Sequence, residues 1–285
     1  MKTTNHTTLY SQEMLSWSVT NGILAFAIVS GNCLILAAFC KNQRLLRMRT
    51  NYFILSLCVA DLIVGLVSIP LTICEQFAYS DTSIKLPRFI HPLSLTVDIF
   101  SGFASIFALA MIALERVFCV YFPHKHKTTP RSTYFSLIAL VWFLSGLMAS
   151  LRLLQFFKVL GITVFFYAMF CLLLGSLLIM LLGYLCVWRR VRQRTKYHFH
   201  HRLTTQEKKF AVTLLIITAT FIVTWMPFHV INIIGYFSVK TLLGVPFTVI
   251  KSTKLLQFCN SLANPIIYTF RIRDFRKTLA AFTKT

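Results

Sequence analysis

Two oppositely charged residues stand side by side in a strongly apolar stretch of the chain. The run LAMIALERVFCVYFP is interrupted by Glu115 and Arg116. A charge near the middle of a membrane costs roughly 2.5–3.5 kcal/mol on insertion scales, so charges there usually serve a function. Asp61, Asp98 and Lys254 raise the same question, because each of them also lies in an apolar stretch. Such residues can pair with one another, hold an ion or bind a charged ligand.

The elements that must position these residues are membrane spans. The 285 residues are 56% hydrophobic and 13% charged, whereas soluble domains average about 25% charged residues. Apolar runs long enough to cross a bilayer occur near 15–40, 52–74, 91–121, 133–151, 159–188, 209–237 and 246–269. The sequence therefore predicts an all-α fold, a seven-transmembrane helix bundle that forms a single domain over residues 1–285.

Lysine and arginine set the predicted orientation. Most of the 29 basic residues follow the first, third, fifth and seventh spans. The positive-inside rule places these segments in the cytoplasm, with 1–14 as an extracellular N-terminus and 271–285 as a cytoplasmic helix and tail. The net charge of +21 then reflects topology and contact with membrane lipids, and no nucleic-acid partner is predicted. The sequon at Asn5 predicts glycosylation outside the cell.

Polar motifs occur in six of the spans in a fixed order. They are SGNCLIL, LSLCVADLIVGL, the Glu115-Arg116 pair, Trp142, FIVTWMPF and NSLANPIIYTFRIRDF. Together they closely resemble the rhodopsin-like (class A) G-protein-coupled receptor family, and the resemblance extends from about residue 22 to residue 279. It implies a plasma-membrane receptor that couples an extracellular small-molecule ligand to a heterotrimeric G protein, with arrestin as a further partner.

Asp61 must face the bundle interior, because it lies in the middle of the second span. Its candidate polar partners are Asn32, Ser105, Asn260, Ser261 and Asn264. Carboxylate, hydroxyl and amide oxygens suit a hard cation, and the resemblance implies that this cluster holds a sodium ion. The alternative is a structural carboxylate satisfied by water. No other metal and no organic cofactor is predicted.

The resemblance also implies an activation switch at the cytoplasmic end of the bundle. Arg116 would pair with Glu115 and with Glu207, and so clamp the third and sixth helices together in the resting state. Release of the clamp would let Arg116 engage the G protein, and Tyr184 and Tyr268 would then swing toward it. The alternative is a fixed ion pair without a switching role.

Two prolines predict kinks that would serve this switch. Pro227 in the sixth span and Pro265 in the seventh each remove a backbone hydrogen bond from their helix. The kinks lie next to Trp225 and near Tyr268, where they would act as hinges.

The outer ends of the spans indicate a ligand site. Asp98 lies near the outer mouth of the third span, at the position where receptors for biogenic amines carry an aspartate. The resemblance therefore implies an amine bound through an ammonium–carboxylate pair. The other candidate ligand-binding residues are Trp225, Phe228, His229, Asn232 and Lys254.

A second interpretation ties Asp98 up inside the protein. Lys254 could pair with Asp98 and occupy the anionic site, or it could bind an anionic ligand itself. The outer loop RLLQFFK is short and lacks a cysteine, and His91 replaces the usual cysteine of the third helix. These features resemble melanocortin, cannabinoid and lysolipid receptors, whereas His229 and Asn232 resemble adenosine receptors. A signalling-silent membrane protein of receptor type is a further alternative, and the sequence shows no catalytic set of an enzyme.

Overall fold

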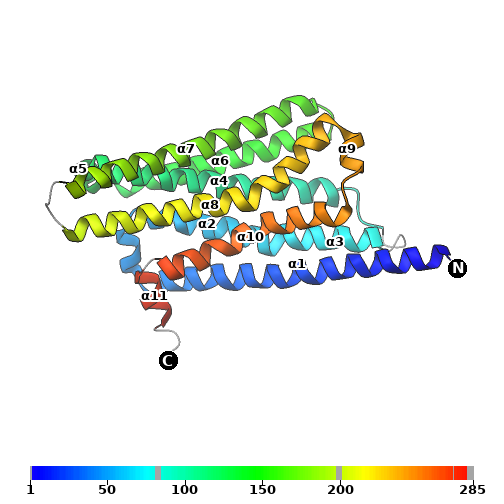
Figure 1. Cartoon of the computed structure of the whole chain (residues 1–285), viewed down its shortest axis with the longest axis horizontal. Helices are drawn as coiled ribbons and strands as arrows, with labels where there is room; N and C mark the ends of the chain where they lie inside the picture. Colours follow the sequence, from blue (N-terminus) through cyan, green and yellow to red (C-terminus); the bar gives the residue numbers. More distant parts are fainter. Residues whose placement is uncertain (1, 81–84, 197–200, 272, 281–285) are drawn as a thin grey trace.

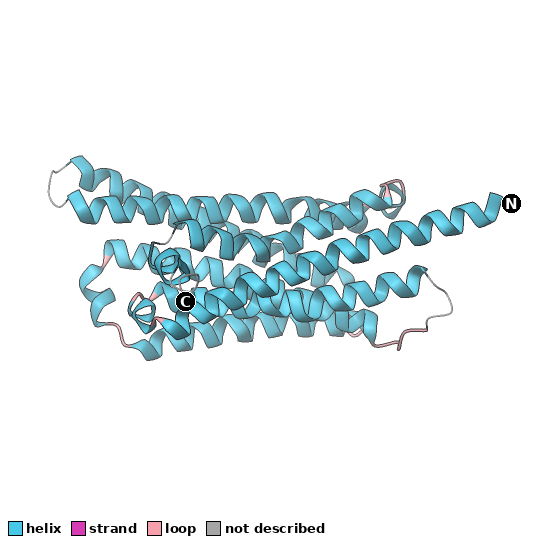
Figure 2. Ribbon diagram, turned by 90° about the horizontal axis from the view of Figure 1, so that it is seen from below, coloured by secondary structure: helices cyan, strands magenta, loops and turns pink. Residues whose placement is uncertain are grey.

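The computed structural model describes residues 2–80, 85–196, 201–271 and 273–280, and these ranges fold into helices joined by short turns. Within them no strand occurs, so the predicted all-α fold is confirmed. The long helices run roughly along one axis and form an elongated bundle (Figures 1 and 2). One end of the bundle carries α9 (Val239–Leu243) and the other carries α11 (Arg273–Ala280), and these are termed the α9 end and the α11 end.

Seven long helical segments of the described residues make up the bundle, in the order predicted for the spans. They are α1 (Lys2–Lys41), α2 with η2 and α3 (Thr50–Ile63, Val64–Ser68, Ile69–Ser80), α4 (Ile90–Tyr121), α6 (Arg131–Phe156), α7 (Ile162–Lys196), α8 (His201–Phe237) and α10 (Phe247–Arg271). Two short helices, η1 (Gln43–Arg47) and α5 (Pro123–Thr128), connect segments near the α11 end.

Six of these segments are long and apolar enough to cross a membrane, judged by length and composition over the described residues. The exception is α10, whose hydropathy is lowered by Lys251, Lys254, Asn260 and Asn264. Both asparagines are buried within the bundle. A span can carry polar side chains when they face the bundle interior and find partners there.

The second span contains a π-helical turn. The segment η2 (Val64–Ser68) lies between α2 and α3 and ends two residues before Pro70. A proline has no amide hydrogen and its ring clashes with the carbonyl of the preceding turn. A π turn widens the helix at such a point, so it accommodates Pro70 without ending the span.

The fourth long helix extends beyond its predicted end at residue 151. It continues to Phe156, and Lys158 then adopts a left-handed conformation with φ 59°. The amide of Val159 donates to the carbonyl of Leu154 at 2.9 Å, which closes the helix end as a C-terminal cap does. Arg152, which the sequence placed in a loop, therefore lies on the last turns of α6.

The helix α4 occupies the centre of the bundle and carries the candidate residues Asp98, Ser105, Glu115 and Arg116. It packs against α2, α6 and α7, and its middle is buried almost continuously from Ser101 to Ala110. A helix enclosed in this way holds its polar side chains at fixed places between its neighbours, which is what a site built from several spans requires.

Candidate functional site

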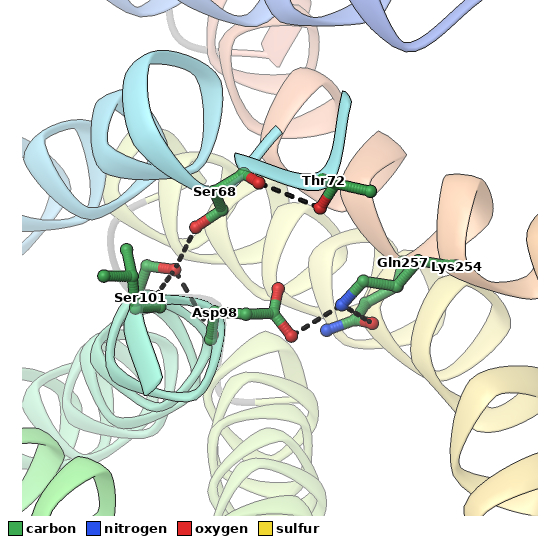
Figure 3. A network of polar contacts seen from close by, with 7 residues as sticks. Ser68, Thr72, Asp98, Ser101, Lys254 and Gln257 are labelled. Atoms are coloured by element: carbon green, nitrogen blue, oxygen red, sulfur yellow. Dashed lines mark hydrogen bonds and ion pairs between the residues drawn. The ribbon is translucent and has the colours of Figure 1, made fainter. Parts of the chain in front are cut away.

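Asp98 and Lys254 form an ion pair between α4 and α10. The ammonium of Lys254 donates to Oδ2 of Asp98 at 2.5 Å and to Oε1 of Gln257 at 3.1 Å (Figure 3). It also lies 4.6 Å from the ring centroid of Phe228 and 4.7 Å from that of Phe258. Of the two arrangements that the sequence left open for Asp98, the structure contains the internal pair.

A polar chain continues from this pair toward the second span. The hydroxyl of Ser101 donates to the carbonyl of Asp98 at 3.3 Å and lies 3.4 Å from the hydroxyl of Ser68 (Figure 3). Ser68 belongs to η2, and its carbonyl accepts a hydrogen bond from Thr72 at 2.9 Å. The ion pair itself joins α4 and α10, and Ser101 links α4 to the second span one helical turn away.

A cavity of about 420 Å³ adjoins Asp98 at the α9 end. Among the candidate ligand residues, Asp98, Phe228 and Asn232 line it, whereas Trp225, His229 and Lys254 do not. Sequence reasoning missed the remaining lining residues, which include Arg152, Phe165, Phe166, Met169 and Tyr236. The only sequence signal for Arg152 was a basic residue in the short outer loop RLLQFFK, and the span expected to end at residue 151 left Arg152 in that loop.

Trp225 and His229 form an aromatic stack in the interior. Phe221, Trp225 and His229 follow one another at i, i+4 and i+8, with ring centroids 5.2 and 5.5 Å apart. Both side chains are buried, and the nitrogens of the two rings find no hydrogen-bond partner among the described residues. A Cβ atom built on Gly102 would lie 2.7 Å from Cη2 of Trp225, so the indole of Trp225 packs directly against α4 at this glycine.

Asp61 is fully buried between α4 and α10. Its carboxylate accepts hydrogen bonds from Asn264 at 2.9 Å and from Ser105 at 3.3 Å. Asn32 donates to the carbonyl of Ser261 at 3.2 Å, one helical turn from Asn264, and its Oδ1 atom is buried without a partner among the described residues. These carboxylate, hydroxyl and amide oxygens are the donors that a hard cation takes.

Asn260, the other candidate of the sodium cluster, contacts a different residue. Its Oδ1 atom accepts a hydrogen bond from the hydroxyl of Thr224 on α8 at 3.4 Å. Thr224 precedes Trp225, so this bond links the Asp61 region of α10 to the aromatic stack of α8.

Glu115 is the hub of a polar cluster at the α11 end. Its carboxylate lies 2.7 Å from Nε of Arg116, 2.6 Å from the hydroxyl of Thr50 and 2.8 Å from Nε2 of His126. Only the contact with Arg116 was predicted. Glu207 lies on α8, but its side chain falls outside the described residues, so its pairing with Arg116 stays a prediction.

The remaining switch residues lie on the predicted helices. Pro227 is inside α8 and Pro265 is inside α10. Tyr268 is buried and its hydroxyl has no partner among the described residues, whereas Tyr184 is half-buried and stacks on Trp188. Asn5 lies on α1, and its side chain is also outside the described part of the chain.

The sequence matches a known protein family over most of its length. The model of the 7 transmembrane receptor (rhodopsin family) matches residues 31–268. The chain belongs to this family of G-protein-coupled receptors. The matched residues include at least part of every long helix, among them the polar α10, so the seven-span bundle is confirmed and the chain belongs to a family of multi-pass membrane receptors.

Individual relatives of the receptor are similar at a modest level. The adenosine receptor A2b of Gallus gallus is 28% identical over 296 residues, which cover 90% of this chain and 84% of that receptor. The human adenosine receptor A2b is 29% identical, with 90% and 86% covered. The 5-hydroxytryptamine receptor 4 of Cavia porcellus is 27% identical, with 90% and 76% covered.

Proposed function

We propose that this receptor binds a small molecule in the cavity at the α9 end, without using Asp98 as a counter-ion for a ligand amine. The observation that carries this proposal is the 2.5 Å contact between Lys254 and Asp98. An ammonium from outside would have to displace Lys254, which Gln257 and two aromatic rings also hold. The protein thus supplies its own cation to the carboxylate.

The bound ligand would act on the bundle through α8. Phe228 and Asn232 on α8 line the cavity, and the aromatic stack around Trp225 lies on the same helix toward the α11 end. We expect the ligand to shift the population between two arrangements of α8 around the kink at Pro227, with a heterotrimeric G protein binding at the α11 end. In this proposal the α9 end lies outside the plasma membrane, Asn5 is glycosylated, and arrestin and membrane lipids are further partners.

The cluster around Asp61 is proposed to hold a sodium ion. The buried carboxylate, the hydroxyl of Ser105 and the amide oxygen of Asn32, which has no partner in the described part of the chain, support this assignment. A cation here would offset the cost of burying the carboxylate and hold α1, α2, α4 and α10 in one arrangement.

A panel of ligands on matched variants tests the proposed function. Cells expressing the receptor would be assayed for G-protein activation by cationic amines, with Asp98→Asn and Lys254→Met alongside. We expect the unmodified receptor to ignore the amines, and Lys254→Met to gain a response to them because Asp98 is then free. An amine response of the unmodified receptor that disappears in Asp98→Asn would overturn the proposal and make this an amine receptor.

Nucleosides are a second candidate ligand class. The adenosine receptors among the relatives favour it, and Asn232 supports it because an amide can donate to and accept from a heterocycle edge. Adenosine and its neutral analogues should then activate the receptor, and Asn232→Ala should reduce their potency. Equal potency on the Asn232→Ala variant would remove this candidate.

A further inference from the structure

We infer that the cavity takes a ligand with a carboxylate or phosphate group on an apolar body, and that Arg152 pairs with this group. The inference rests on the proposed function only in placing a small-molecule ligand in this cavity. Four features carry it: the position of Arg152, the lack of a counter-ion beside it among the described residues, the apolar walls and the neutralised Asp98.

Arg152 is held at the wall of the cavity by neutral groups. Its guanidinium lies 5.4 Å from the ring centroid of Phe165 and donates a hydrogen bond to the amide oxygen of Gln155. The side chain is half-buried on the last turns of α6, with the cavity on one side. A ring and an amide orient a guanidinium, but neither neutralises its charge.

The acidic side chains that the structure describes are engaged elsewhere. Asp98, the carboxylate that lines the cavity, is bonded to Lys254. Glu13 accepts a hydrogen bond from Thr248, and Asp61 accepts hydrogen bonds from Ser105 and Asn264. Glu75 contacts His91, and Glu115 contacts Thr50, Arg116 and His126. Among these residues Arg152 has no ion pair. A partly desolvated cation without a counter-ion is unfavourable, so an anionic ligand that pairs with the guanidinium would stabilise it.

The rest of the cavity fits an apolar body. Its walls include Phe165, Phe166, Met169, Phe228 and Tyr236. Phe166 and Tyr236 stack face to face with centroids 3.9 Å apart, which closes the wall between α7 and α8. The volume of about 420 Å³ lies in the ordinary range for small-molecule sites, which are mostly apolar with a few polar groups that fix orientation.

The charges of the site discriminate against cations. Lys254 cancels Asp98, so the charge that Arg152 adds leaves the cavity region positive. A guanidinium offers two parallel N–H donors that match a carboxylate or a phosphate, which makes the contact selective as well as strong. Asn232 is the second polar group able to orient such a ligand.

The test measures binding to the purified full chain by thermal stabilisation, without G protein. The probes are aryl and long-chain alkyl carboxylates, each paired with its methyl ester, and phosphate monoesters paired with their parent alcohols. At least one acid series should stabilise the receptor, and its neutral partner should bind about ten- to a hundredfold more weakly. The series that binds identifies the anion as carboxylate or phosphate.

Two variants assign the effect to Arg152. Arg152→Gln should lose about ten- to a hundredfold in affinity for the acid but not for the ester. Lys158→Gln removes an exposed cation six residues further along the chain and should bind the acid like the unmodified receptor. If Arg152→Gln does not fold, Arg152→Lys keeps a cation without the paired donors and should show an intermediate loss.

Three results would overturn the inference. They are equal binding of acid and ester, unchanged acid binding by the Arg152 variants, and no stabilisation by any acid of the panel. Stabilisation by an acid that never activates a G protein would instead count against the proposed function while the role of Arg152 stands.

Discussion

Lys254 of α10 reaches across the bundle to Asp98 of α4, and their charged atoms lie 2.5 Å apart. The two side chains are 19% and 16% exposed, so the pair is largely removed from water. Phe228 and Phe258 flank the ammonium, and Gln257 takes a second of its hydrogens. The pair therefore fixes the spacing between two helices and withdraws the carboxylate from ligand recognition.

Removing one member of this pair should lower the stability of the receptor more than removing both. Lys254→Met leaves Asp98 without its cation and should lower stability by about 2–3 kcal/mol, because a charged hydrogen bond is lost in a poorly solvated place. The double variant with Asp98→Asn should recover much of that loss. Thermal unfolding of the two single variants and the double variant, compared as a cycle, measures the coupling. Additive losses would show that the pair contributes nothing specific.

Sodium should stabilise the receptor through Asp61. Raising sodium chloride at constant ionic strength, with choline chloride as the balancing salt, should raise the melting temperature of the purified receptor. Asp61→Asn should abolish this dependence, because the carboxylate supplies the charge that holds the cation. A receptor whose melting temperature ignores sodium would leave Asp61 as a structural carboxylate.

Loss of the His126 contact should raise ligand-free signalling. His126 of α5 bonds the carboxylate of Glu115, which also contacts Arg116. His126→Ala should weaken this cluster by about 1 kcal/mol and favour release of Arg116. Basal G-protein activation, normalised to surface expression, provides the measurement. His124→Ala is the matched control, because His124 is exposed on the same short helix and should leave basal activity unchanged.

A methyl group on Gly102 should disturb the aromatic stack. Its Cβ atom would lie 2.7 Å from Cη2 of Trp225, and the indole is confined between Phe221 and His229. Gly102→Ala should therefore cost about 1–3 kcal/mol through overpacking and change basal activity. Gly175→Ala adds the same methyl group where no atom lies within 4 Å, so it should be neutral or stabilising. Similar melting temperatures for the two variants would contradict the close contact.

The sequence by itself determined the class of fold and much of the interior polar cluster. Long apolar runs in a chain with few charges have one stable arrangement in lipid, which is a set of helices. The burial of Asp61 followed from its place in the middle of a span, and Ser105 and Asn264 were among its named partners. The charge of the loops predicted an orientation, which the structure does not test.

Only the tertiary structure decided which distant residues meet. Helical periodicity gives the face on which Asp98 or Lys254 lies, but their distance depends on how α4 and α10 pack, so a ligand ion pair and an internal one looked alike in sequence. Thr50 and His126 became partners of Glu115 for the same reason. Arg152 lies in the cavity wall because α6 continues to Phe156, past its predicted end at residue 151. The periodicity of one sequence does not give the distances between helices, and these distances determine which residues form the ligand site.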